Sequence, residues 1–351
     1  MTDALRIDGQ KLQFHPRRVA QWLDGKDRWE TAKEIYPIYL ELSPIGGCNH
    51  SCRMCGVDYV IEDAKADGKK IPQLDADMMH VRLQEMGALG VKSVMWAGSG
   101  EPTLHKRMDD MVRSARQAGI DVAFTTNGTV LNKLATVPEC NWIKVSINGG
   151  TRDTYAQVHR CKPSDWDRVW ENVADAITRK GQCMIGAQLV VLPENQHEVD
   201  AFQAKCAEVG VDYCVIKPFS QHKFSINRQY ENFIPIVPAA KFGNVVVRSD
   251  AMRTRAIPYE KCQATPYVWA YVEANGDVYS CSAYLLDDRF RLGNLNTHTF
   301  KEVWQGEKRR ANWEYVRETL DIHECRVNCR MNKVNEYLTE LERGVPGQAF
   351  I

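Results

Sequence analysis

Short apolar runs alternate with amphipathic helical patterns through the middle of this chain, and this alternation constrains its fold most strongly. Between the runs lie segments with apolar residues at helical spacing. Such alternation predicts a parallel sheet with right-handed crossovers. Six units are too few for a closed eight-stranded barrel, so we predict an α/β fold, an open six-stranded partial (β/α) barrel. The six predicted strands are Ile38–Leu42, Ser93–Trp96, Val122–Thr125, Trp142–Ile147, Met184–Val191 and Tyr213–Lys217.

The helices expected between these strands have recognisable ends. Asp75–Leu89, Leu104–Ala118 and Asn195–Val209 each carry an apolar stripe and stop before a glycine. The run Ser164–Asp167 has the pattern of a capping box, so we expect another helix to begin there. Folds of this type place their chemistry at the C-terminal ends of the strands, which directs attention to the loops that follow each strand.

Cys48, Cys52 and Cys55 follow the first predicted strand in a C-x3-C-x2-C spacing. Three thiolates can hold three irons of a cubane cluster and leave the fourth iron without a protein ligand. An open coordination position points to chemistry at the metal. A partial zinc site is the first alternative, although structural zinc requires four ligands. Disulfides are the second, but thiols stay reduced in the cytoplasm, where we expect a chain without a signal peptide to reside.

The loop after the second strand reads Gly98-Ser99-Gly100-Glu101-Pro102. Glycines allow the backbone to approach a ligand closely. Together with the cysteine spacing, this loop resembles the radical S-adenosylmethionine (radical SAM) enzymes. The resemblance implies the same partial barrel and an open iron that chelates the amino acid end of S-adenosylmethionine.

The resemblance also implies further cofactor contacts. Gly98, Ser99, Gly100 and Glu101 correspond to a glycine-glycine-glutamate motif that binds the methionine ammonium, with Ser99 at the first of its two glycines. Met54 stands where the family usually has an aromatic residue beside the adenine, and methionine offers a similar apolar contact. The remaining carried-over positions are Ser146 and Asn148 at the ribose, where the family often has Asp in place of Asn148, and Gln188 and Val190 on the fifth strand.

Four further cysteines, Cys262, Cys281, Cys325 and Cys329, lie in the C-terminal part. The turn Asn275-Gly276 between two apolar runs predicts a β-hairpin, which brings Cys281 back towards Cys262. The spacing resembles SPASM/twitch auxiliary-cluster domains, and four cysteines fit the shorter twitch version with one cluster. Tetrahedral zinc is the alternative. We therefore expect two 4Fe-4S clusters, one that binds S-adenosylmethionine and one auxiliary.

Composition limits the partners. Lys plus Arg and Asp plus Glu number 45 each, so the sequence has no excess of basic residues that would indicate binding to nucleic acid. It also has no run of 18 apolar residues that would indicate a membrane-spanning helix.

The motifs and patterns divide the chain into four parts. We expect an N-terminal extension over 1–35, the partial barrel over 36–225, a linker over 226–258 and the small auxiliary-cluster domain over 259–351.

The resemblance implies that an electron donor such as flavodoxin or ferredoxin reduces the first cluster, and that a 5′-deoxyadenosyl radical then abstracts hydrogen. We expect a small polar metabolite as substrate, a sugar, aminocyclitol or polyol, that is dehydrogenated or epimerised, with a slight preference for dehydrogenation. A maturase acting on a ribosomal precursor peptide is the alternative, and a non-catalytic electron carrier is disfavoured by the open iron. The catalytic candidates are Cys161 as a hydrogen donor and Lys217 and His222 as polar groups that line the pocket.

Overall fold

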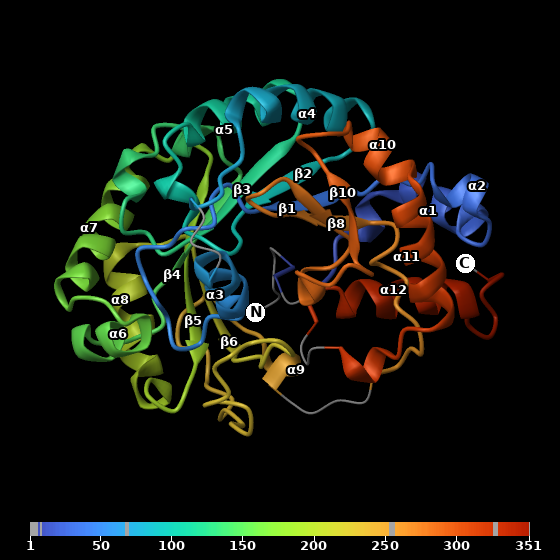
Figure 1. The fold of residues 1–351 in the computed structure, drawn as a ribbon. Helices are drawn as coiled ribbons and strands as arrows, with labels where there is room; N and C mark the ends of the chain where they lie inside the picture. Colours follow the sequence, from blue (N-terminus) through green and yellow to red (C-terminus); the bar gives the residue numbers. More distant parts are fainter. Residues whose placement is uncertain (1–5, 8, 67–69, 253–256, 326–328, 351) are drawn as a thin grey trace.

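The computed structural model describes residues 6–7, 9–66, 70–252, 257–325 and 329–350. Ten strands of these residues form one sheet in the order β10-β9-β8-β1-β2-β3-β4-β5-β6-β7. The sheet curves into an arc whose outer face is covered by helices (Figure 1). The strands are β1 (Tyr39–Leu42), β2 (Ser93–Trp96), β3 (Asp121–Thr126), β4 (Trp142–Ser146), β5 (Met184–Val191), β6 (Tyr213–Pro218), β7 (Val245–Val247), β8 (Trp269–Val272), β9 (Asp277–Tyr279) and β10 (Arg291–Asn294).

Helices follow most of the barrel strands, as the alternation predicted. Within the described residues they are α1 (Pro16–Gly25), α2 (Trp29–Ala32), α3 (Asp58–Ala66), α4 (Ala76–Ala88), α5 (Met108–Gln117), α6 (Arg152–His159), α7 (Ser164–Arg179), α8 (Val199–Val209), α9 (Ser249–Met252), α10 (Phe300–Gln305), α11 (Glu307–Glu318) and α12 (Asn332–Arg343). Neighbouring strands from β1 to β7 pair in parallel. The predicted α/β class and all six predicted strands are confirmed.

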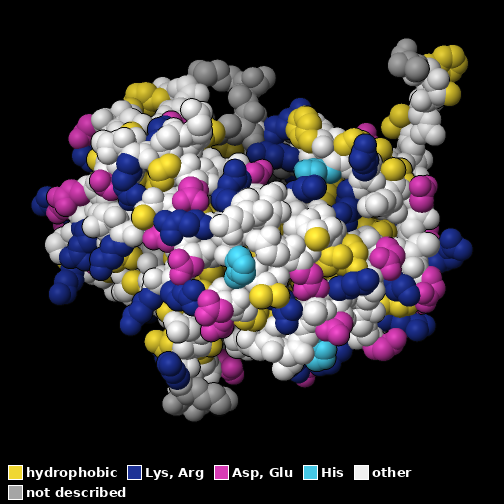
Figure 2. Space-filling model, turned by 90° about the horizontal axis from the view of Figure 1, so that it is seen from above, with side chains coloured by type: hydrophobic (Ala, Val, Ile, Leu, Met, Phe, Trp, Pro, Cys, Tyr) yellow, Lys and Arg dark blue, Asp and Glu magenta, His cyan; other side chains and the backbone are white. Residues whose placement is uncertain are grey.

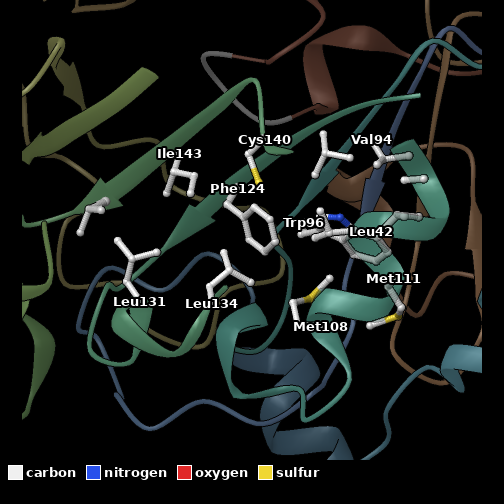
Figure 3. Close-up of a cluster of buried hydrophobic side chains, with 14 of the residues drawn as sticks. Leu42, Val94, Trp96, Met108, Met111, Phe124, Leu131, Leu134, Cys140 and Ile143 are labelled. Carbon is white, nitrogen blue, oxygen red and sulfur yellow. The ribbon is translucent and has the colours of Figure 1, made fainter. Parts of the chain in front are cut away.

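The core lies between the outer face of the sheet and these helices. Alternate strand residues such as Leu42, Val94 and Phe124 point outward and pack against Met108 and Met111 of α5 (Figure 3). Because side chains alternate between the two faces of a strand, the residues between them point into the barrel.

The sheet has more strands than the six predicted. The hairpin β8–β9 forms with Gly276 at positive φ in its turn, as the Asn-Gly pair predicted, but β8 also pairs in parallel with β1. At the other edge β7, inside the segment expected to be a linker, pairs with β6. An open six-stranded sheet leaves unpaired backbone groups at both edges, and β7 and β8 satisfy them.

The structure differs from prediction at one helix cap and at the starts of two helices, α5 and α8; α8 begins at Val199, after a 3-10 turn at Gln196–Glu198. The capping box at Ser164 is wrong: Pro163 already adopts helical angles, φ −55° and ψ −32°, so Ser164 lies inside α7, where its side chain cannot cap the helix. α5 begins at Met108, because Pro102–Leu104 forms a separate 3-10 turn. In α4, by contrast, the Asp75 side chain accepts from the amides of Asp77 and Met78 and caps the predicted helix.

The N-terminal residues pack on the C-terminal part of the chain. Trp22 meets Tyr267 edge to face at 6.4 Å, and Tyr267 donates a hydrogen bond to the carbonyl oxygen of Lys26 at 2.7 Å. Lys26 also pairs with Glu342 at 2.7 Å. These contacts brace the hairpin that borders β1.

The inner face of the sheet is partly exposed along β4. In β4 the inward residues Trp142, Lys144 and Ser146 are half-buried, whereas Ile143 and Val145 on the outer face are buried. On the face seen in Figure 2, acidic and basic side chains are interspersed. No helix in the described ranges is long and apolar enough to span a membrane.

Candidate active site

The cysteine loop lies at the C-terminal end of β1. Burial raises the pKa of the Cys52 thiol well above its ordinary value, and the neighbouring Cys55 and Cys48 add to the rise. The three sulfurs are therefore close enough to repel one another as thiolates. Three thiolates can persist together in such a place only beside a strong positive charge, and a bound metal supplies one.

The Gly98–Pro102 loop packs directly against the cysteine loop. A Cβ atom on Gly100 would overlap the carbonyl oxygens of Ile45 and Gly47. The Glu101 amide donates to the carbonyl oxygen of Gly47 at 2.9 Å. Gly98, at φ +113°, lies against Ser43. The glycines of this motif thus serve the contact between two loops as well as close approach to a ligand.

Glu101 is buried, and its carboxylate accepts four hydrogen bonds. They come from the amide and hydroxyl of Thr103 at 3.1 and 2.5 Å, the Thr126 hydroxyl at 2.5 Å and the Asn127 amide at 2.7 Å. Burial raises its pKa, although these hydrogen bonds oppose the rise. The side chain joins the ends of β2 and β3, so much of its acceptor capacity is already used within the protein.

Asn127 connects the end of β3 to the cysteine loop. Its side-chain amide donates to Asn49 Oδ1 at 2.8 Å, and Asn49 donates to Thr129 Oγ1 at 2.8 Å. The His50 amide points at Cys48 Sγ at 3.4 Å. These contacts give the loop after β3 a role in positioning the cysteine loop.

Ser99, which stands in place of a glycine, has a partner far along the chain. Its hydroxyl donates to the buried carboxylate of Glu273 at 2.5 Å and lies 3.0 Å from the Ser43 hydroxyl. Glu273 follows β8, so this contact exists only because the C-terminal hairpin pairs with β1. The departure from the expected motif therefore ties the C-terminal part to the loop after β2.

Ser146 and Gln188 come together at the inner, C-terminal end of β4 and β5, where they are paired in register. Gln188 is buried, and its Oε1 has no hydrogen-bond partner among the described residues. A buried polar atom normally has a partner, so this acceptor fits a ligand hydroxyl such as that of a ribose.

The side chain of Asn148, unlike those of Ser146 and Gln188, is engaged in hydrogen bonds within the protein. The residue is fully buried at positive φ, +52°, and its Oδ1 accepts from the Val190 amide at 2.9 Å. Asn195 donates to its carbonyl oxygen at 3.0 Å. These contacts hold the turn after β4, and the positive φ suits asparagine better than most residues.

Met54 lies in a small apolar cluster at the same end of the barrel. The cluster contains Val190, Leu192 and Tyr230, with Met54 and Phe219 packed against it. A planar adenine ring would find a matching apolar surface here. The sequence pointed to Met54 and Val190 separately, and the structure brings them together.

Asp58, directly after the cysteine loop, fastens the segment that follows β6. Its carboxylate accepts from the amides of Ile226 and Asn227 at 3.0 and 2.9 Å and from the Ser225 hydroxyl at 3.0 Å. No motif marked Asp58 in the sequence. The one feature of the sequence that could have pointed to Asp58 is its position at the start of helix α3, where a carboxylate is favourable.

The three catalytic candidates lie in different surroundings. Cys161 shares a cluster with His50 and Asp165, packs against the hydrophobic core, and lies near enough to Cys52 to raise the pKa of that thiol. Lys217 points inward near the end of β6, in register with Val190. His222 stacks on Tyr59 at 5.3 Å.

His159 was missed by the sequence analysis. Its Nδ1 lies 3.2 Å from Cys52 Sγ, and its Nε2 donates to the carbonyl oxygen of Ile147 at 2.9 Å. Burial lowers the pKa of His159 to about 3, so the ring is neutral.

The four C-terminal cysteines also assemble. Burial raises the pKa of the Cys281 thiol well above its ordinary value, and Cys329, Cys262 and Cys325 add to this rise. Polar groups approach the sulfurs: Asn335 Nδ2 lies 3.6 Å from Cys262, and the Tyr284 hydroxyl lies 3.2 Å from Cys325. Hydrogen bonds of this kind tune the potential of a cluster.

The cysteine sulfurs of the described residues are not gathered as closely as the ligands of a single zinc ion. Tetrahedral zinc would hold its thiolates roughly 3.8 Å apart, given Zn–S bonds of about 2.3 Å. Within the described ranges, no three cysteine sulfurs lie within 4.8 Å of one another.

Comparisons with known proteins agree with this geometry. The model of the radical SAM superfamily matches residues 42–205, and the model of the SPASM iron-sulfur cluster-binding domain matches residues 262–330. A probable GTP 3′,8-cyclase of Saccharolobus solfataricus is 28% identical over 177 residues, which are 49% of this chain and 54% of that protein. The chain thus spans about half the length of the curated relatives it matches.

Two solved structures share the fold. SuiB of Streptococcus suis, bound to its precursor peptide SuiA, superposes with a TM-score of 0.60 at 16% identity, over 95% of this chain and 78% of that chain. The enzyme anSMEcpe with bound AdoMet gives 0.55 at 19% identity, over 80% and 83%. With two assembled cysteine sets matched by two family models, this chain belongs to the radical SAM superfamily, carries a C-terminal SPASM-type domain, and uses S-adenosylmethionine and 4Fe-4S clusters as its cofactors.

Proposed function

We propose that Cys48, Cys52 and Cys55 hold the cluster that binds S-adenosylmethionine, and that the four C-terminal cysteines, Cys262, Cys281, Cys325 and Cys329, hold one auxiliary 4Fe-4S cluster. The mutual effect of the thiols on their pKa values supports both sets. When bound, the first cluster and S-adenosylmethionine supply hydrogen-atom abstraction from an unactivated carbon. A flavodoxin or ferredoxin is the proposed electron donor, and cysteines that form no disulfide among the described residues fit the reducing cytoplasm.

The protein positions the cofactor through two groups of residues. The backbone of Gly98, Ser99 and Gly100, held in place by Glu101, faces the methionine end. Ser146 and the unpartnered Oε1 of Gln188 receive the ribose hydroxyls, and Met54 packs on the adenine. Asn148 supports this group from behind, through its hydrogen bond to β5.

We propose a small polar metabolite as substrate: a sugar, an aminocyclitol or another polyol. The observation that carries this proposal is the set of charged side chains on the inner face of the barrel. Glu41, Lys144 and Lys217 point into it by strand alternation, and both lysines keep partial exposure. Several curated relatives, among them the first three, are named for GTP, which is also a small polar molecule.

Dehydrogenation fits this site better than epimerisation. An epimerase must return a hydrogen atom to the substrate, and the Cys161 thiol instead packs against the hydrophobic core beside His50 and Asp165. The auxiliary cluster, when bound, supplies an acceptor for one electron. Lys217 and His222 are the proposed polar residues of the substrate space.

A peptide is the second candidate. Between β6 and β7 the side chains of Ile226, Ile234 and Ile236 are exposed, with exposed fractions of 60%, 78% and 75%. An extended peptide would cover such apolar side chains. The fold neighbour SuiB is described with a bound precursor peptide.

The two candidate substrates, a small polar metabolite and a peptide, can be distinguished by testing which compound raises the formation of 5′-deoxyadenosine. The reconstituted enzyme is given dithionite, S-adenosylmethionine and a panel of polyols, aminocyclitols and sugars, and products are identified by mass spectrometry in deuterated water. Dehydrogenation gives a product two mass units lighter, whereas epimerisation gives one that carries solvent deuterium. Stimulation only by a peptide encoded beside this chain would contradict the proposal.

A further inference from the structure

A charged group lies deeper in the barrel than the proposed cofactor site. Lys144 is on β4, two residues before Ser146 and on the same inner face. At about 3.3 Å per residue, it lies roughly 7 Å further in than Ser146. A substrate that reaches into the open barrel beneath the cofactor would therefore meet its ammonium group.

Arg330 reaches the inner face of the barrel at β1 and acts electrostatically on Lys144. It precedes α12 in the C-terminal part, forms an ion pair with Glu41 of β1, and donates to the Tyr39 hydroxyl at 2.8 Å. The Arg330 side chain keeps an exposed fraction of 43%, whereas that of Glu41 keeps 8%. The guanidinium thus neutralises the buried carboxylate and still faces solvent.

Lys144 retains its charge without a counter-ion. Within the part of the chain that the structure describes, its Nζ has no hydrogen bond or ion pair. The Nζ atom lies over the ring of Trp142, 5.7 Å from the ring centroid. Burial, with Arg330 and Arg248 nearby, lowers the pKa of Lys144 to about 8, and Glu41 partly opposes this. Glu41 and Arg330 cancel each other, so Lys144, Glu41 and Arg330 together carry one net positive charge, and Arg248 adds to it.

A half-buried ammonium without a partner costs free energy that an anion would recover. We propose that Lys144, with Arg330 beside it, binds an anionic group of the substrate, a carboxylate or a phosphate. This inference rests on the proposed function, because it assigns the open barrel to the substrate. It narrows the substrate to a polar metabolite that carries an acidic group at one end, away from the carbon that loses hydrogen.

The test is calorimetric titration of the reconstituted enzyme, carrying both clusters, with inorganic phosphate in one arm and acetate in the other. The variants are Lys144→Met and, as a matched control, Lys133→Met, which changes an exposed lysine on the outer side. Because a hydrogen bond to a charged group is strong, Lys144→Met is expected to weaken binding about tenfold or more, while Lys133→Met binds like wild type. The arm that binds more tightly identifies the headgroup.

A labelling experiment covers the case in which Lys144→Met fails to fold. Wild-type enzyme is treated with a trace of acetic anhydride, with and without the better anion, and acetylation of each lysine is read by mass spectrometry. Protection of Lys144 by several-fold, with Lys133 unaffected, supports the site. Equal labelling of Lys144, equal affinity in the two variants, or no binding of either anion overturns it. Cleavage of S-adenosylmethionine by wild type without substrate tests the proposed function separately, so that failure there leaves the anion result readable.

Discussion

Replacing Asn335 by leucine should damage the auxiliary cluster site without touching a cysteine. Asn335, on α12, is buried, and its Oδ1 accepts hydrogen bonds from the amides of Gln263 and Ala264, both at 2.8 Å. These amides directly follow Cys262. Asn335 therefore fixes the backbone that presents this sulfur to the other three.

The magnitude follows from the two amides. The Ala264 amide is buried and would lose its acceptor, at a cost of about 1–3 kcal/mol, while the partly exposed Gln263 amide can turn to water and adds less. We expect a total loss of about 2–3 kcal/mol in the free energy of unfolding. Unfolding entropy of about 2.1 cal/mol/K per residue over 351 residues gives about 0.7 kcal/mol/K, so the Tm should fall by about 3–4 °C.

The assay compares Asn335→Leu with Asn132→Leu, which makes the same change at an exposed position. Thermal unfolding and iron content are measured on anaerobically reconstituted protein. Asn132→Leu should stay within about 1 °C of wild type, and Asn335→Leu should lose up to half of its iron as the second site loosens. Equal Tm and equal iron in the two variants would refute the reasoning.

Two further predictions concern the loops around the first site. Gly100→Ala places a methyl group against the carbonyl oxygen of Ile45 and should push the two loops apart, so reconstituted iron should fall from about eight to about four per chain while the auxiliary cluster remains visible by electron paramagnetic resonance. Glu198 supports the start of α6: burial alone would raise its pKa, but three donors, among them Thr154, hold it below its ordinary value. The stability from this group is present above the unfolded pKa and is lost as the pH falls below about 4.3. Urea unfolding of the apoprotein should therefore show a steeper loss between pH 5 and pH 3 for wild type than for Glu198→Gln, and parallel curves would contradict it.

Local pattern predicted the barrel well because its strands are short, apolar and regularly spaced. The six strands and the Asn-Gly hairpin were all found, since each depends on residues close together in sequence. The pairing of β8 with β1 was not predicted, because nothing local marks which edge a hairpin will join. The same limit hid the contact between Ser99 and Glu273, which lie 174 residues apart.

Within the site, only the residues that belong to sequence motifs could be predicted. The cysteines follow a spacing, and the structure brings both sets together. Asn148 matched a family position, yet its positive φ turns the side chain into the protein, and spacing alone does not reveal a backbone angle. Asp58 and Asn335 belong to no motif, and they hold backbone amides that become neighbours only in the fold.

The central claim is that three cysteines hold a cluster that cleaves S-adenosylmethionine while four others hold a second cluster. The most direct measurement is iron content and 5′-deoxyadenosine formation, with dithionite as reductant, in wild type and in the triple variant Cys48→Ala, Cys52→Ala, Cys55→Ala. The account predicts about eight irons and cleavage in wild type, and about four irons with no cleavage in the variant. Zinc in place of iron in wild type, or undiminished 5′-deoxyadenosine from the variant, would contradict it.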